Sequence, residues 1–314
     1  MYSRRIWSDY KKAIRRKRLI VATATLVIIG SVTAVFIHFS GRSVGGIKGE
    51  RREILQLWDS GSFNEIFSLS QEALVSRPMD YFLLTMHGFS AYQLGVSQIN
   101  SLNALQYFDD CVWSLRKAML QKNSVNDGRL YYVLGKAYSY KGGSFADLSV
   151  KYLEKARELS FNAADIPQYL GMAYAAIGDY RSSVAAFTEA LGAEGNLGPT
   201  GPLLLSIARS YFALDEYDAA RAYLQRCVEI SPDSRTILSA RLLLAEVLLK
   251  ADDIDGAKRQ LQGILDEMGN IAEAHYQLGE LYALQGETTH ARAEWRLALR
   301  ADPAHVKARA RLSI

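Results

Sequence analysis

The side chains that could perform chemistry are scattered along this sequence rather than clustered. The five histidines, His38, His87, His275, His290 and His305, show no metal-ligand spacing with cysteine, aspartate or glutamate. Histidines dispersed on helices are far more often surface residues than ligands, so the sequence predicts no metal site. No nucleophile elbow and no arrangement of paired carboxylates stands out. We therefore expect neither a catalytic site nor a cofactor.

Two short segments have the composition of ligand-binding loops but lack the residues that such loops require. Asp252–Gly256 resembles the start of a calcium loop, yet no bidentate glutamate follows at the right spacing. The glycine-rich segment 192–202 lacks both the lysine and the strand–loop–helix context of a phosphate-binding loop. We interpret the first segment as a turn between two helices and the second as a connection that is not helical.

One recurring pattern places the remaining side chains on helices. In residues 167–190, PQYLGMAYAAIGDYRSSVAAFTEA, three residues mark a first helix, a turn follows at Gly178–Tyr180, and three more mark a second helix. These six positions are Leu170, Gly171, Tyr174, Ser183, Phe187 and Ala190. The same spacing recurs in residues 207–232 and 276–303. The pattern predicts a series of helical hairpins.

This pattern resembles the tetratricopeptide repeat, a helix–turn–helix unit of about 34 residues. The resemblance implies an all-α, right-handed α-solenoid of about seven repeats over residues 47–314, with a short C-terminal capping helix. Small residues such as Gly171 let the two helices of a repeat approach, and large residues such as Trp295 fill the volume toward the next repeat. The second repeat departs most from the pattern of the family, because it includes an insertion of about eleven residues around 96–105. The sixth is expected near 238–265.

The two cysteines fit this arrangement as buried apolar residues. Cys227 occupies a position where other repeats have Ala190 and Ala298, which predicts burial as a small side chain. Cys111 lies about three repeats earlier, and repeats of a solenoid contact only their neighbours. We therefore expect no disulfide within one chain.

The family resemblance also implies a binding surface. In this family, first-helix positions line a concave groove that holds protein or peptide partners. Carrying those positions over gives the following residues: Phe89, Tyr92, Arg129, Tyr132, Lys136, Tyr140, Gln168, Met172, Arg209, Phe212, Glu246, Tyr276 and Glu280. Aromatic, methionine and arginine side chains are common anchors at interfaces. Alternatively, several of these aromatic side chains fill gaps between helices, and the sequence leaves both interpretations open.

The N-terminal residues have a different composition from the repeats. Residues 1–18 carry eight basic side chains and one acidic residue, which leaves 29 basic and 32 acidic residues in the rest of the chain. Residues 19–40 include no formal charge and an apolar run long enough to cross a hydrocarbon core of ~30 Å. The positive-inside rule then predicts a transmembrane helix at 19–40, a cytoplasmic tail at 1–18 and a linker at 41–46. A cleaved signal peptide is the alternative, disfavoured by the length of both segments.

These observations predict a scaffold rather than an enzyme. We expect a bacterial inner-membrane protein that displays its repeats in the periplasm and supports assembly of a cell-envelope complex, such as flagellar, secretion, outer-membrane or cell-wall machinery. The alternatives are a translocon-associated periplasmic holdase for exported proteins and an enzyme accessory subunit. The mildly acidic body argues against nucleic-acid binding, and no small-molecule substrate is expected.

Overall fold

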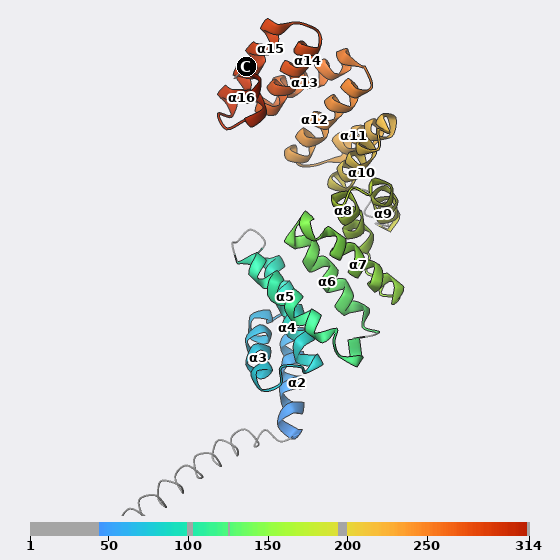
Figure 1. The fold of residues 1–314 in the computed structure, drawn as a ribbon, viewed down its shortest axis with the longest axis vertical. Coiled ribbons are helices and arrows are strands. Elements are labelled where there is room, and N and C mark those ends of the chain that lie inside the picture. The colour runs from blue at the N-terminus through green and yellow to red at the C-terminus, as the bar shows by residue number, and fades with distance from the viewer. Residues whose placement is uncertain (1–43, 99–102, 125, 194–199, 313–314) are drawn as a thin grey trace, which may run out of the picture. The chain divides into compact units, whose positions relative to one another are not determined.

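The computed structural model describes residues 44–98, 103–124, 126–193 and 200–312, and every regular element in these ranges is a helix (Figure 1). Fourteen of the helices form seven successive pairs: α2 (Val44–Asp59) with α3 (Phe63–Ser76), α4 (Tyr81–Ser97) with α5 (Ala104–Ala118), α6 (Gly128–Lys141) with α7 (Ala146–Glu158), α8 (Ile166–Ala176) with α9 (Tyr180–Ala193), α10 (Gly201–Ala213) with α11 (Tyr217–Ile230), α12 (Ser234–Lys250) with α13 (Ile254–Met268), and α14 (Ala272–Leu284) with α15 (Thr288–Ala301). A short helix, α16 (Val306–Leu312), follows, and single 3-10 turns lie at η1 (Lys122–Ser124) and η2 (Gly143–Phe145). The pairs are the seven expected repeats.

The described chain forms two compact units, one ending at Leu69 and one beginning at Ser70. In the first unit the chain turns after α2 at Gly61, and the rings of Trp58 and Phe63 pack edge to face at 5.3 Å. In the second unit, consecutive helices pack against one another from α4 to α16. Each helix therefore buries its apolar face against its neighbours in sequence, as a repeat architecture requires.

Glycines in the first helices allow close approach of the second helices. A Cβ atom at Gly171 would lie 2.5 Å from Cδ1 of Phe187, and one at Gly279 would lie 2.5 Å from Cδ1 of Trp295. The Ser183 hydroxyl donates to the backbone carbonyl of Gly171 at 2.8 Å, which ties the same two helices together. The expected packing role of these small residues is confirmed. In the second and third repeats, Gly88 and Gly135 are close in the same way to Leu115 and Leu153.

The turn inside each of the last four repeats contains a residue with a left-handed backbone conformation. Gly178 and Gly286 occupy this position with φ of 81° and 78°, and Asp215 and Asp252 occupy it with φ of 60° and 64°. Aspartate is one of the few residues with a side chain that tolerates this conformation. The next aspartate, Asp253, caps α13 by accepting the Gly256 backbone N–H at 2.8 Å. The acidic run 252–256 is thus a turn and a cap, as predicted, and the described residues include no cluster suited to a metal ion.

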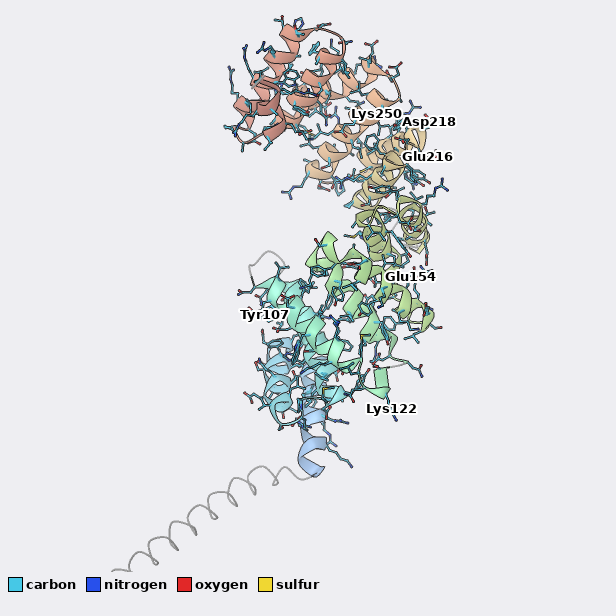
Figure 2. The ribbon with its side chains drawn as sticks, viewed as in Figure 1. Tyr107, Lys122, Glu154, Glu216, Asp218 and Lys250 are labelled. Carbon is cyan, nitrogen blue, oxygen red and sulfur yellow. The ribbon has the colours of Figure 1, made fainter. Side chains whose placement is uncertain are left out.

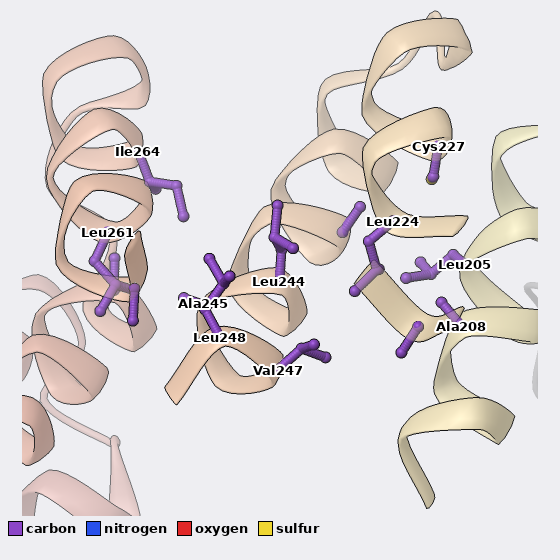
Figure 3. Close-up of a cluster of buried hydrophobic side chains, with 14 of the residues drawn as sticks. Leu205, Ala208, Leu224, Cys227, Leu244, Ala245, Val247, Leu248, Leu261 and Ile264 are labelled. Carbon is purple, nitrogen blue, oxygen red and sulfur yellow. The ribbon is translucent and has the colours of Figure 1, made fainter. Parts of the chain in front are cut away.

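A continuous apolar core joins the repeats from α10 to α14 (Figure 3). Leu224 lies between α10 and α12, and Leu261 of α13 packs toward Ala245 of α12 within the next pair. Cys227 belongs to this core, and Cys111 is equally buried on α5. Both are free thiols, and burial raises the pKa of each. The prediction that Cys227 packs as a small apolar residue is confirmed.

Several helix boundaries differ from the sequence-based expectations. Helix α2 already begins at Val44, within the expected linker, and α12 begins at Ser234 because the Asp233 side chain caps it by accepting the Thr236 N–H at 2.7 Å. Helix α4 continues to Ser97, so part of the expected insertion lengthens a helix instead of forming a loop. The prediction that segment 192–202 is not helical is wrong at both of its ends: Gly192 lies in α9, and Pro202 stands in the first turn of α10, where its fixed φ favours helix initiation.

The predicted tail at 1–18 and transmembrane helix at 19–40 lie outside the described residues. Among the helices that the structure describes, none has the length and apolar character needed to span a bilayer.

Candidate functional site

The first helices of neighbouring repeats share one side of the second unit. Helix α4 contacts α6, α6 contacts α8, and the series continues through α10 and α12 to α14. Across the described ranges, second helices make no comparably extensive contacts with one another. When helix pairs stack, the side on which helices lie closest together is the inner side of the curvature. All thirteen predicted groove residues are on these first helices.

The predicted groove residues differ in their exposure. Arg129, Gln168, Met172 and Arg209 are exposed. Phe89, Tyr132, Tyr140, Phe212, Glu246, Tyr276 and Glu280 are half-buried. Tyr92 and Lys136 are buried, with exposed fractions of 7% and 8%. Tyr92 and Lys136 are therefore not accessible to a partner, and the predicted site is corrected at these two positions.

Lys136 is held inside the protein by a group of side chains that we call the lysine cluster: Tyr92, Tyr132, Lys136, Tyr140, Asp165 and Tyr169. The Lys136 ammonium lies 2.6 Å from Oδ2 of Asp165 and donates to the Tyr132 hydroxyl at 2.9 Å. Its nitrogen also lies 4.5 Å from the centre of the Tyr169 ring and 5.6 Å from that of Tyr92. Rings at these distances attract a cation. The cluster satisfies the ammonium internally.

Further contacts join the cluster across three repeats. The Tyr132 hydroxyl donates to Oδ1 of Asp165 at 2.8 Å, and the hydroxyls of Tyr140 and Tyr169 are 2.8 Å apart. Burial raises the pKa of Tyr132, and the hydrogen bond to the Asp165 carboxylate raises it further. Since α4, α6 and α8 all contribute side chains, the cluster fastens first helices to one another. The cluster therefore stabilises the fold, and the cation that it can hold is the Lys136 ammonium itself.

Asp165 and Tyr169 were missed by the sequence reasoning. Asp165 precedes α8 at the N-cap position, where an aspartate normally accepts a backbone N–H. Here it makes no such cap, because Lys136 and Tyr132 occupy its carboxylate. No sequence signal distinguishes this aspartate from an ordinary cap. Tyr169, one helical turn after Asp165, could have been found from the i, i+4 spacing.

Beyond the lysine cluster, the middle of the groove side presents accessible groups. Met172 is 49% exposed on α8, and Gln168 is exposed one turn before it. Arg209 is exposed on α10, and its neighbour Phe212 packs its ring 6.0 Å from that of Tyr217. An exposed methionine and an exposed arginine on adjacent helices can contact an external chain.

At the C-terminal end, three predicted residues line one pocket of 220 Å³, which we call the α12–α14 pocket. They are Glu246, Tyr276 and Glu280. The other lining residues are Ala245, Leu249, Ala257, Leu261, Gln277, Leu281 and Lys307. The side chains come from α12, α13, α14 and α16, so the pocket forms only when the last two repeats and α16 are packed together.

Helix α16 places basic side chains beside this pocket. Arg311 Nε donates to Oε1 of Glu280 at 2.8 Å, and its NH2 group contacts the other carboxylate oxygen. The Lys307 ammonium lies 3.8 Å from Glu273, and Nε2 of His305 lies 3.0 Å from the same carboxylate. Gln277 Nε2 donates to Oε1 of Glu246 at 2.9 Å. The carboxylates of Glu273 and Glu280 are therefore paired with α16.

Comparison with known proteins identifies the repeat type. Residues 200–313 match the family model of the tetratricopeptide repeat-like domain. The chain is 24% identical over 233 residues to the anaphase-promoting complex subunit CDC16 of Saccharomyces cerevisiae, a match that covers 72% of this chain and 25% of that protein. The chain thus spans about a quarter of the length of that relative.

Two solved structures share the fold. The C-terminal part of a TPR repeat-containing protein from Cytophaga hutchinsonii is 15% identical, with a TM-score of 0.57 over 84% of this chain and 100% of that one. PilW, described as a widely conserved type IV pilus biogenesis factor, is 16% identical, with a TM-score of 0.55 over 72% of this chain and 98% of that one. The chain therefore has the fold of tetratricopeptide repeat solenoids, and its residues 200–313 match that family. Repeats of this kind bind protein or peptide partners, and proteins built from them are typically scaffolds without enzymatic activity.

Proposed function

We propose that this chain is a membrane-anchored scaffold that binds protein partners along the first-helix side of its repeats. The observation that carries the proposal is the run of accessible anchors on adjacent first helices, namely Gln168 and Met172 on α8 and Arg209 on α10. Phe187 and Trp295 of the second helices are buried in the fold and unavailable to a partner, whereas Trp113 on the second helix α5 is 54% exposed.

The membrane and envelope parts of the proposal rest on the N-terminal sequence. Eight basic side chains in residues 1–18 precede the uncharged segment 19–40, a combination that favours a transmembrane anchor with a cytoplasmic N-terminus. The repeats then lie in the periplasm of a bacterium and hold components of an envelope complex. The likeness to PilW, a pilus biogenesis factor, is compatible with this setting, although at 16% identity it extends to the fold alone.

Site-specific crosslinking in intact cells tests the proposal. A photoreactive amino acid replaces Met172 or Arg209 in the full-length chain, and the matched controls carry it at Thr188 or Gln225, which are exposed on second helices α9 and α11. We expect one or a few discrete adducts from the first two positions and much weaker ones from the controls. Mass spectrometry should identify the captured proteins as envelope components exposed outside the cytoplasm.

The other outcomes are informative as well. Equal adducts from α8 and α11 positions would mean that binding is not confined to the first-helix side. A broad distribution of exported proteins instead of discrete partners would favour the holdase alternative. Cytoplasmic partners would contradict the proposed orientation in the membrane.

A further inference from the structure

We propose that the α12–α14 pocket receives an arginine side chain of the bound partner. This inference rests on the proposed function, since it names the chemistry of one contact within the partner-binding surface. The pocket combines an apolar floor with hydrogen-bond acceptors that the described chain leaves incompletely used. An arginine has a matching structure, with a flexible apolar stem and a planar cationic end.

The floor of the pocket suits the methylene groups of a long side chain. Leu249 of α12, Leu261 of α13 and Leu281 of α14 line it together with two alanines. Leu261 and Leu281 belong to the core cluster and are almost fully buried, so the floor is fixed by the packing of the repeats. An arginine stem lying on these side chains would remove apolar surface from water on both sides.

The first unused acceptor is Oε1 of Gln277. This residue is only 9% exposed, and among the described residues its Oε1 atom is buried with no hydrogen-bond partner. Its Nε2 donates to Glu246 at 2.9 Å and to Glu273 at 3.4 Å. The opposite amide orientation would place the oxygen against these two carboxylates, so the network fixes the orientation. A buried acceptor left without a donor costs free energy, which a donor on a ligand would recover.

The second acceptor is the carboxylate of Glu246. It accepts from Gln277, and within the described ranges no basic side chain lies within 4.0 Å of it. Burial raises the pKa of Glu246 and the neighbouring Glu273 raises it further, whereas Lys307 and Lys250 lower it. The lysine cluster shows the contrast, because there the chain places its own ammonium against Asp165. The described chain places no such ammonium against Glu246, so a cation that pairs with this carboxylate would come from a bound ligand.

The neighbouring charges leave Glu246 accessible to such a cation. Lys250 is an exposed residue at the C-terminal end of α12 (Figure 2), and Lys307 extends from α16 with 64% of its side chain exposed. Glu280 is already neutralised by Arg311. Neither lysine forms an ion pair with Glu246, so the pocket retains one half-buried carboxylate beside one free amide oxygen.

Two adjacent acceptors of different type favour arginine over lysine. A guanidinium carries five N–H donors in a fixed plane and can bond a carboxylate and an amide oxygen at once. It is also more weakly hydrated than an ammonium, so it enters a half-buried site at lower cost. Tyr276 lines the same pocket, and the Lys307 ammonium lies 5.5 Å from the centre of its ring, so a cation can approach this ring.

The test uses three small probes and the full-length chain in mild detergent. N-acetyl-arginine amide is titrated while the methyl signals of Leu249, Leu261 and Leu281 are followed by NMR. A probe with about fifteen non-hydrogen atoms should bind with Kd on the order of 1 mM. N-acetyl-lysine amide should bind at least several-fold more weakly. N-acetyl-citrulline amide, which has the same shape without the charge, should bind about 10-fold more weakly.

Variants of the chain give the matched control. Glu246→Gln keeps an oxygen that can accept from Gln277 but removes the charge, and it should weaken arginine binding about 10-fold. Glu229→Gln removes the same charge from an exposed position on α11 and should leave binding unchanged. A thermal melt of each variant verifies that it is folded.

The proposal is overturned if the leucine signals do not respond to the arginine probe, if citrulline or lysine binds as tightly, or if the Glu246 variant binds like the wild type. Each of these results is separable from a failure of the proposed function. Crosslinks from Met172 on α8 would persist if only the arginine assignment were wrong, and they would disappear if the first-helix side bound no partner.

Discussion

At Gly171 and Gly279 the lack of a side chain sets how closely the two helices of a repeat approach. The space that a Cβ atom would need is occupied by Phe187 and Trp295. Gly192, in contrast, is a helical glycine of α9 with no atom within 4 Å of the equivalent point. The three glycines therefore separate the effect of helix propensity from the effect of packing.

Alanine at each of the three positions should show this difference. Gly192→Ala should stabilise the chain by up to about 1 kcal/mol, because alanine loses less conformational entropy in a helix. Gly171→Ala and Gly279→Ala should instead destabilise it by about 1–2 kcal/mol, since overpacking exceeds the gain in propensity. Urea unfolding of the three variants measures the effect. A stabilised Gly171 variant would mean that Phe187 can move aside without cost.

Residue-level prediction from the sequence succeeded where a residue's role follows from the repeat pattern. The pattern identified the packing glycines and the buried Cys227. Glu246, Tyr276 and Glu280 line one pocket, and their role in binding a partner stays a prediction. It failed for Tyr92 and Lys136, because burial at those positions depends on Asp165 and Tyr169 from another repeat. Gln277 was missed for the same reason, since its importance comes from an oxygen that its neighbours leave unbonded.

At the scale of the helices, the lysine cluster links α4, α6 and α8 through polar contacts in a half-buried position. An ammonium that is 90% buried at the side chain needs its anion, whereas the Asp165 side chain is 37% exposed and can be solvated without a partner. The two members of the pair are therefore not equivalent. Removing the Asp165 carboxylate should therefore lower the free energy of unfolding more than removing the Lys136 ammonium does.

We expect Asp165→Ala to cost about 2–3 kcal/mol, a value reduced from that of a fully buried pair because water reaches the carboxylate. Lys136→Met, which keeps the volume and removes the charge, should cost less than about 1.5 kcal/mol. Denaturant midpoints of both variants and of the double variant provide the measurement. In the double variant most of the Asp165→Ala cost should disappear, and an additive result would show that the two side chains do not act as a pair.

Over the whole second unit, extensive contacts are limited to helices that are close in sequence. The free energy of unfolding in such an arrangement is a sum of the stabilities of the single repeats and of the interfaces between neighbouring repeats. A destabilising substitution at one end therefore need not destabilise the repeats at the other end. Trp295 is a suitable position, since it is 7% exposed and packs with Ala291, Ala298 and Ala308 in the last repeat.

Trp295→Ala should remove about 3–5 kcal/mol of local stability. Hydrogen exchange should then show faster exchange of backbone amides in α14, α15 and α16, with protection in α6 and α7 close to that of the wild type. Uniform loss of protection across all helices would indicate a single cooperative unit and would contradict the repeat description.

The number and order of the helices could be predicted from the sequence because each repeat carries its own signals, a turn residue and a small–large helix contact. Gly178 and Gly286 mark two such turns, and Asp215 and Asp252 mark two where glycine is absent. The insertion in the second repeat could not be assigned, because α4 continues to Ser97 in the absence of a stop signal at its expected end. Helix ends depend on caps and tertiary contacts that periodicity does not encode.

The short helix α16 also affects the order in which the protein folds. Contacts between sequence neighbours close small loops, so helix pairs can pack one after another while the chain is still being synthesised from its N-terminus. At each moment only the most recent pair exposes an uncovered apolar face. Ala308 of α16 is fully buried against the last repeat, so the apolar face of that repeat is covered only after α16 has been synthesised and has docked. A nascent chain that has formed α15 but not yet α16 therefore exposes the apolar face that Ala308 later covers, and such a face can promote aggregation.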